Sequence, residues 1–224
     1  MDLAVSDAVD LGVGLPTLTD DELLAVVLGG DGTEQVLTPR LLPSVDVQNP
    51  EAVASAALRG QRSLAVRGLV DAGGTLAPGL LALAATLRSV RPAVALYLGD
   101  DDLVMRTFVG SVFWRRDADR WTRHMISAVG AHAFAVCDPQ DIGPDVADLQ
   151  LRVAHRPPAG EGDPLWLCVA ASTDDRSEIV AVAPGQAAVA EYDAGGALVR
   201  RDALPVAEVV PAVIRCVEVA LSPA

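Results

Sequence analysis

Residues 93–136 read AVALYLGDDDLVMRTFVGSVFWRRDADRWTRHMISAVGAHAFAV, and this stretch decides the fold. Short apolar runs alternate with turns rich in acidic residues, of which 99–102 (GDDD) and 116–119 (RDAD) are the clearest. Runs of this length between such turns are typical of antiparallel strands. We therefore predict a meander with strands over 94–98, 103–109, 111–115, 120–126 and 133–136.

A second block of strands follows a segment rich in proline and glycine. Residues 156–164 (RPPAGEGDP) have the composition of a linker. Beyond it we predict strands over 165–171, 178–182, 187–192 and 197–201. We expect a single domain over 1–224, with possible halves 1–156 and 165–224 and a mostly antiparallel sheet built from the two meanders.

Helix signals lie in the N-terminal third and at the C-terminus. Thr19 and Glu22 form a capping box before the apolar run 23–28, and two glycines follow at 29–30. Asn49 and Pro50 begin a second helix that ends near Gly68. We predict further helices over 78–89 and 211–221, and an extended piece at 36–38. Helices and strands that come in separate runs indicate an α+β fold.

The charge of the chain excludes several classes of function. It carries 30 acidic and 17 basic residues, a net charge of -13, and every basic residue is arginine. Nucleic acid is therefore an unfavourable partner, and chemistry that needs a lysine amine is impossible. The abundance of Ala, Val, Leu, Gly and Arg is typical of GC-rich genomes such as those of actinobacteria.

Targeting signals and cysteine usage both favour a cytoplasmic protein. The N-terminus has neither a basic region nor a continuous apolar stretch, and the longest uncharged run, 72–87, falls short of the ~20 residues that span a bilayer. We therefore expect no membrane insertion. Cys137, Cys168 and Cys216 are far apart and lie in apolar runs, so we predict buried, reduced thiols.

The search for catalytic motifs gives no positive result. His124, His132 and His155 lie in no recognised pattern, no metal-ligand spacing occurs, and we expect no cofactor. Acidic residues recur at 138, 141, 145 and 148, but prolines at 139 and 144 should break a helix there. We predict one or two helical turns from 143 to 149 with a polar face opposite the apolar positions 142, 146 and 149, in preference to a cation site.

The stretch most typical of a binding surface is the hairpin over 112–124. Tryptophan and arginine dominate binding hot spots, because they combine a large contact area with directional hydrogen bonds. The candidate partner-binding residues are Phe113, Trp114, Arg115, Arg116, Arg120, Trp121 and Arg123. The alternative is an ordinary hairpin whose aromatic side chains face the core and whose arginines pair with nearby acids.

Residues 56–59 (AALR) and 64–81 (LAVRGLVDAGGTLAPGLL) resemble the EspG family of actinobacterial type VII secretion chaperones. The order of the predicted elements, helices followed by two strand blocks and a last helix, is similar to that of the family. The resemblance implies a non-catalytic cytosolic adaptor whose partner is a helical secretion substrate of the PE/PPE type, held by its hydrophobic tip. It transfers no functional residue, because the family has no catalytic motif.

Two other classes of function stay open. One is a different protein-interaction module, such as an immunity or regulatory protein. The other is an enzyme without a linear motif, which predicts a pocket that holds His124 or His132 beside a carboxylate.

Overall fold

The computed structural model describes residues 16–29, 42, 44–89, 92–100, 102–103, 105–117, 120–127, 129–155, 165–173 and 175–221. Within these ranges it contains five α-helices and nine strands, and the strands form an antiparallel sheet in the order β1-β5-β4-β3-β2-β6-β7-β8-β9. The predicted α+β class is confirmed.

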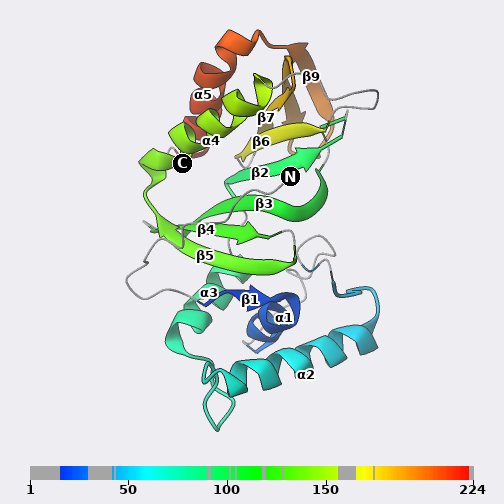
Figure 1. Ribbon diagram of the computed structural model, residues 1–224, viewed down its shortest axis with the longest axis vertical. Coiled ribbons are helices and arrows are strands. Elements are labelled where there is room, and N and C mark those ends of the chain that lie inside the picture. The colour runs from blue at the N-terminus through cyan, green and yellow to red at the C-terminus, as the bar shows by residue number, and fades with distance from the viewer. Residues whose placement is uncertain are drawn as a thin grey trace. The chain divides into compact units, whose positions relative to one another are not determined.

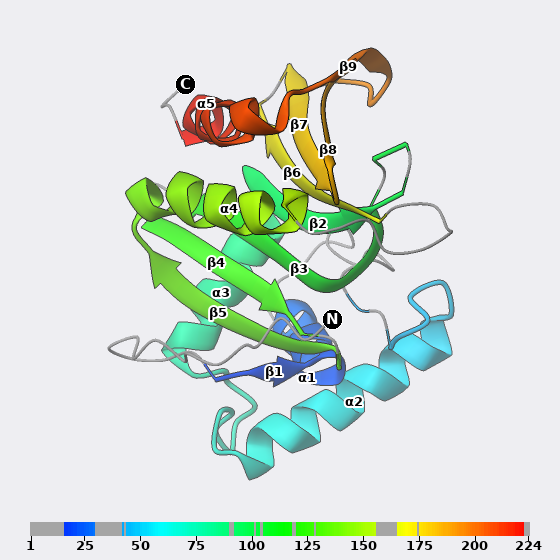
Figure 2. The same cartoon turned by 45° about the horizontal axis from the view of Figure 1, so that its top comes forward.

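Figure 1 labels most of the helices and strands, and Figure 2 also labels β8. The elements along the chain are β1 (Leu18–Thr19), α1 (Asp20–Leu28), α2 (Pro50–Val66), α3 (Pro78–Ser89), β2 (Val94–Gly99), β3 (Met105–Asp117), β4 (Arg120–Ile126), β5 (Ala131–Cys137), α4 (Pro139–Ala154), β6 (Trp166–Ser172), β7 (Arg176–Ala183), β8 (Gln186–Asp193), β9 (Leu198–Ala203), the 3₁₀ helix η2 (Val206–Glu208) and α5 (Val209–Leu221).

The chain divides into two compact units. Unit 1 comprises 1–91, 108–110 and 122–136, and unit 2 comprises 92–107, 111–121 and 137–224. The predicted linker 156–164 and the predicted extended piece 36–38 lie outside the described residues. The elements on both sides of that linker, α4 before it and β6 after it, belong to unit 2.

In unit 2 one face of the sheet packs against α4 and α5, which lie on the same side of β6 and β7 (Figure 2). Side chains along a strand alternate between the two faces. Leu167 and Val169 on β6 therefore join Val180 and Val182 on β7 in the core under the helices, and the two strands pair in this register. These four side chains are at most 4% exposed, so this face supplies much of the apolar burial.

The opposite face of the unit 2 sheet is rich in alanine, and Leu103 in the turn between β2 and β3 packs against it. The hydroxyl of Tyr97 donates to the carbonyl of Leu103, at 3.0 Å, and the hydroxyl of Tyr192 donates to that of Asp102, at 2.9 Å. Leu103 has a φ of 59°, in the left-handed region that is unfavourable for residues other than glycine. Its side chain is 1% exposed, so burial of the side chain offsets the strain of the backbone. Two tyrosines thus fix the β2–β3 turn onto the sheet.

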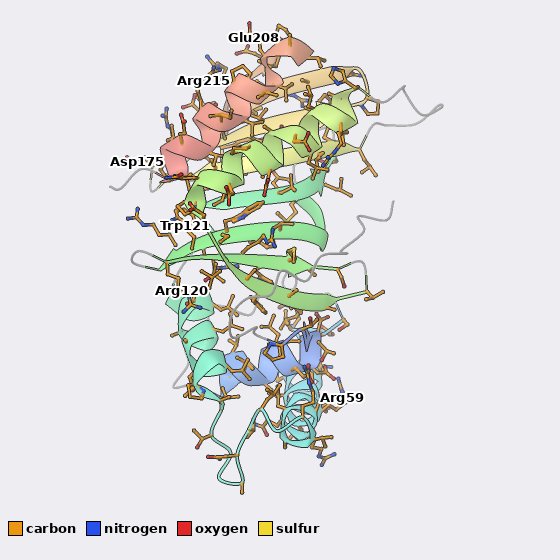
Figure 3. The ribbon with its side chains drawn as sticks, turned by 60° about the vertical axis from the view of Figure 1, so that its left-hand side comes forward. Arg59, Arg120, Trp121, Asp175, Glu208 and Arg215 are labelled. Atoms are coloured by element: carbon orange, nitrogen blue, oxygen red, sulfur yellow. The ribbon has the colours of Figure 1, made fainter. Side chains whose placement is uncertain are left out.

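In unit 1, α2 packs closely against α1. A methyl group at Gly60 would lie 1.9 Å from the carbonyl oxygen of Asp21, so only glycine fits this crossing without a shift of the backbone. Beside Gly60, Arg59 donates two hydrogen bonds to the Asp21 carboxylate, at 2.7 and 3.0 Å. Further along α2, Ser63 and Arg67 donate hydrogen bonds to the Glu22 carboxylate, at 2.6 and 2.7 Å. Figure 3 labels Arg59 on α2.

Several local predictions are confirmed. Thr19 accepts a hydrogen bond from the amide of Glu22, whose carboxylate accepts one from the amide of Thr19, and α1 is capped at Gly29. Asn49 caps α2, and Pro50 is its first residue. Among the described residues, no helix is long and apolar enough to cross a membrane.

Two predicted boundaries are wrong. The strands expected over 103–109 and 111–115 are one strand, β3, because Gly110 adopts a φ of 78° and lets the chain continue through an irregularity. The short helix expected over 143–149 is the middle of a 16-residue helix, α4, which begins at Pro139 and contains Pro144. Gly143 has no Cβ to clash with the proline ring, and Gln140, whose carbonyl loses its usual N–H partner, is exposed to solvent.

The polar side chains of α4 agree with the sequence interpretation. Ile142 and Val146 are buried, whereas the acidic residues at 138, 141, 145 and 148 are exposed, so they form a polar face. Of the three cysteines predicted to be buried, Cys168 and Cys216 are buried, whereas Cys137 is half-buried.

Candidate functional site

The structure places the aromatic residues of the 112–124 hairpin in the interior. Phe113, Trp114 and Trp121 are 3–5% exposed, and both tryptophans belong to the core under α4 and α5. Arg115 is also buried and its guanidinium lies 5.6 Å from the ring of Phe113. Burial lowers the pKa of Arg115 to about 10, which is still high enough to keep it charged at neutral pH.

The other arginines of the hairpin differ in exposure. Arg116 is half-buried, and Arg120, labelled in Figure 3, is exposed. Arg123 is half-buried, and its Nε has no hydrogen-bond partner among the described residues. Of the seven candidate residues, the structure brings Arg116 and Trp121 together at one groove.

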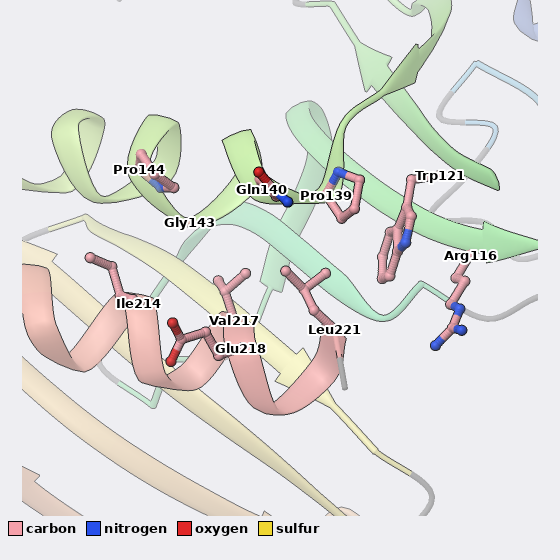
Figure 4. Close-up of a pocket in the computed structure, with 10 residues that line it drawn as sticks. All are labelled: Arg116, Trp121, Pro139, Gln140, Gly143, Pro144, Ile214, Val217, Glu218 and Leu221. Carbon is pink, nitrogen blue, oxygen red and sulfur yellow. The ribbon is translucent and has the colours of Figure 1, made fainter. Parts of the chain in front are cut away.

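That groove has a volume of about 530 Å³ and lies wholly within unit 2, between α4 and α5 (Figure 4). We call it the α4–α5 groove. The residues that line it are Arg116, Trp121, Pro139, Gln140, Gly143, Pro144, Ile214, Val217, Glu218 and Leu221. Its volume is within the range of pockets that bind small ligands or the side chains of a partner.

Helical periodicity explains the α5 wall of the groove. Ile214, Val217 and Leu221 are three and four residues apart, so they fall on one side of the helix, and Figure 4 shows them pointing toward α4. Val217 is 1% exposed, but Ile214 and Leu221 are only half-buried. The wall therefore keeps apolar surface accessible from the groove.

The α4 wall owes its shape to the start of that helix. Asp138 accepts a hydrogen bond from the amide of Gln140 at 2.9 Å and caps α4, and Pro139 occupies its first position. A methyl group at Gly143 would lie 3.9 Å from the Cα of Ile214, so the two helices approach each other here. The prolines at 139 and 144 add rigid apolar surface to this wall.

The polar groups of the groove are few. Arg116 and Glu218 are the ionisable residues among those that line it, and they carry opposite charges. The groove is therefore mostly apolar, with one ionisable group of each charge among its lining residues. The groove thus has the properties of a docking surface.

Sequence reasoning identified only part of this site. The density of arginine and tryptophan indicates Arg116 and Trp121, whereas the sequence analysis assigns no binding role to the apolar residues of α5. The spacing of Ile214, Val217 and Leu221 was visible in the sequence. Their partial exposure depends on how α4 and α5 pack, and no local pattern encodes that packing.

A second candidate is a chain of polar side chains in unit 1. Asp20 Oδ1 lies 2.6 Å from His132 Nε2, and His132 Nδ1 lies 2.9 Å from His124 Nε2. The backbone amide and hydroxyl of Ser44 also donate to Asp20 Oδ2, the amide at 2.8 Å. His124 is stacked on Phe134, with 4.3 Å between the ring centroids.

This chain differs from a hydrolytic triad in two respects. The serine hydroxyl contacts the carboxylate instead of an imidazole, so no histidine can take its proton. Burial raises the pKa of Asp20, but hydrogen bonds from His132 and Ser44 outweigh it and bring the pKa below its ordinary value, which makes this carboxylate a weak base. Both imidazoles are at most 1% exposed. The geometry is that of a structural anchor.

Among the described residues, no group of three or more His, Cys, Asp or Glu side chains could hold a metal ion. No protein-family model matches the sequence, and no curated protein matches it. Fold and site together define an α+β protein with a mostly apolar groove between α4 and α5.

Proposed function

We propose that this chain is a non-catalytic cytosolic adaptor or chaperone that holds a helical type VII secretion substrate of the PE/PPE type before export. The observation that carries the proposal is the α4–α5 groove, an accessible apolar surface between two helices with one group of each charge. The resemblance of residues 56–81 to the EspG family supplies the class of partner.

A helical partner fits the groove better than an extended one. The α5 wall extends from Ile214 to Leu221, about 10 Å at 1.5 Å per residue, which is two helical turns. A partner helix that presents apolar side chains at i, i+3 or i+4 and i+7 covers the same length. The apolar tip of a secreted helical bundle would bury such side chains here and be shielded from aggregation.

The charge of the whole chain bears on the solubility of such an adaptor. The net charge of -13 elsewhere keeps the chain soluble while its groove exposes apolar surface.

Co-expression with PE–PPE pairs from the native host tests the proposal. Leu221→Glu places a charge on the apolar wall of the groove. Val219→Glu is the matched control, because Val219 is 42% exposed on the same helix and does not line the groove.

We expect wild type and Val219→Glu to co-purify with at least one pair. We expect Leu221→Glu to bind it about fivefold to thirtyfold more weakly, since loss of an apolar contact costs about 1–2 kcal/mol. Equal capture by the two variants would contradict a role for the groove. Failure of the wild-type chain to capture any pair would contradict the proposed partner.

A further inference from the structure

The strand β9 lies at one end of the sheet and belongs to unit 2. It pairs with β8 on one side, and among the residues that the structure describes no strand pairs with its other side. All six of its residues are exposed, and the apolar side chains of Leu198 and Val199 are 54% and 62% exposed. An edge strand presents a row of backbone groups with which another strand can pair. The outer side of β9 is therefore a candidate surface for association.

The ladder between β8 and β9 shows which backbone groups face outward. The amide of Leu204 donates to the carbonyl of Ala187 at 2.9 Å, so these two residues form a hydrogen-bonded pair. Along an antiparallel ladder such pairs alternate with pairs whose N–H and C=O groups point away from the neighbouring strand. Arg201 and Ala203 belong to pairs of the second kind. Each of them directs one donor and one acceptor away from β8.

The charged side chains of β9 are divided between the two faces of the strand. Arg200 and Asp202 share one face and form an ion pair at 3.0 Å, with side chains that are 61% and 55% exposed. Arg201 lies on the other face, and its guanidinium is 5.8 Å from the centre of the Trp166 ring on β6. Because β6 lies inward of β7, β8 and β9 in the sheet, the charge of Arg201 is directed back over the sheet and away from its outer edge.

The charges of β9 are complementary to those of a second copy of the same strand. In an antiparallel pair of β9 strands with a twofold axis at Arg201, Arg200 of each copy lies opposite Asp202 of the other. Each of these four side chains then has an opposite charge beside it on its own strand and another across the pair. A twofold axis at Arg200 or at Asp202 would place like charges directly opposite each other. The charges therefore select the axis at Arg201.

We propose that β9 forms the interface of a symmetric dimer of this chain, in which two β9 strands pair antiparallel about Arg201. The two Arg201 residues exchange hydrogen bonds through the N–H and C=O groups that face away from β8. Ala203 of each copy faces Val199 of the other, so part of the exposed apolar surface of Val199 becomes covered. The sheets of the two copies are then joined edge to edge.

A second copy fits this edge better than a strand of a single charge. A twofold contact brings the same surface of both copies together, and β9 carries both signs at positions that become opposite in such a contact. A purely acidic or purely basic strand would meet one favourable and one unfavourable side chain. The net charge of -13 repels two copies at long range, but physiological salt screens exposed charges that are farther apart than about 8 Å. The contact involves one short strand, so the dimer is expected to be weak and reversible.

Sedimentation velocity over a range of protein concentrations at physiological salt tests the dimer. Arg200→Asp places two acids opposite each other, and Asp202→Arg places two arginines opposite each other. We expect the dissociation constant of the dimer to rise at least about fivefold in each single variant, since two cross-strand pairs change from opposite to like charges. The double variant Arg200→Asp/Asp202→Arg exchanges the charges and should return to within about twofold of the wild type.

The matched controls use an exposed ion pair on α4. Arg152 and Asp148 are 63% and 62% exposed, so Arg152→Asp and Asp148→Arg change the net charge by the same amounts away from β9. Both controls should dimerise like the wild type. None of the residues that line the α4–α5 groove lies on β9, so the dimer and the groove are tested independently.

Amide hydrogen exchange of β9 in the wild-type chain locates the contact. We expect exchange at Arg201 and Ala203 to slow as the protein concentration rises, while exchange at Asp202, whose amide faces β8, stays the same. A chain that stays monomeric up to about 1 mM would overturn the proposal, and is the result expected if the charges of β9 only protect the edge or if another protein covers it. A dimer that both single variants form as well as the wild type would overturn the interface. Failure of the double variant to recover would overturn the axis at Arg201.

Discussion

Replacement of Gly60 by alanine is expected to disrupt the contact between α1 and α2. The added methyl group would lie 1.9 Å from the carbonyl oxygen of Asp21 and 2.9 Å from the Cβ of Ala25, whereas ordinary contacts begin at 3.4 Å. The atom in the way belongs to the backbone of a helix, so rotation of a side chain cannot relieve the overlap. α2 must move away by about 1.5 Å, the difference between the two distances.

The size of the effect follows from what this shift breaks. Overpacking costs about 1–3 kcal/mol, and loss of the bonds from Ser63 and Arg67 to the buried carboxylate of Glu22 costs about 1.5–3 kcal/mol more. The higher helix propensity of alanine returns about 1 kcal/mol. We expect Gly60→Ala to lower the free energy of unfolding by about 1.5–5 kcal/mol.

Urea denaturation followed by far-UV circular dichroism, together with amide exchange in α1 and α2, measures this change. Gln61→Ala, the next residue and exposed on the same helix, serves as the control and should change stability by less than about 0.5 kcal/mol. If Gly60→Ala is as stable as wild type, or more stable by the propensity difference, the close helix crossing described here is incorrect.

Three further predictions concern single residues. Leu103→Ala should lower the free energy of unfolding by about 2–5 kcal/mol, because it removes a buried side chain. Leu103→Gly should be no less stable than Leu103→Ala, because glycine adopts the φ of 59° without the strain of about 1 kcal/mol that other residues have there. A Leu103→Gly variant that is clearly less stable than Leu103→Ala in urea denaturation would contradict this. Burial raises the pKa of Asp20 and Glu22, but the hydrogen bonds that their carboxylates accept outweigh burial and bring both pKa values below the ordinary ones. Both carboxyl groups are therefore protonated at a higher pH in the unfolded chain than in the folded one, so the free energy of unfolding should fall as the pH drops below about 4. A free energy of unfolding that is the same at pH 5 and pH 3 would argue against these bonds. Burial raises the pKa of Cys168 and Cys216 to about 12. Both thiols should therefore resist iodoacetamide at pH 8 until the protein is unfolded in urea. Labelling of the native protein at either position would refute their burial.

The features that could be predicted from the sequence are those with local causes. The capping box of Thr19 and Glu22 and the cap at Asn49 each act within a few residues, and the structure has both helices where these signals place them. The acidic turns of the meander likewise mark strand ends directly. The predictions at Gly110 and Pro144 are wrong. Gly110 was expected to end a strand, but it continues β3 with a positive φ, and Pro144 was expected to break a helix, but it is tolerated in α4 after a residue without a Cβ.

The features that could not be predicted depend on contacts between distant residues. Asp20 and His132 are 112 positions apart, and nothing in the sequence near either residue indicates their hydrogen bond. The groove depends on how two helices, α4 and α5, meet at Gly143 and Ile214. Arginine and tryptophan density pointed to Arg116 and Trp121, but burial of Trp121 means that an alanine there would test core packing as well as binding.

Hydroxyl-radical footprinting of the wild-type chain, with and without a bound PE–PPE pair, tests whether the α4–α5 groove holds the partner. This method reports the solvent access of single side chains. If the groove holds the partner, oxidation of Ile214 and Leu221 falls on binding while that of Val219, on the same helix outside the groove, stays unchanged. A complex that forms while Ile214 and Leu221 remain as reactive as in the free chain would contradict it.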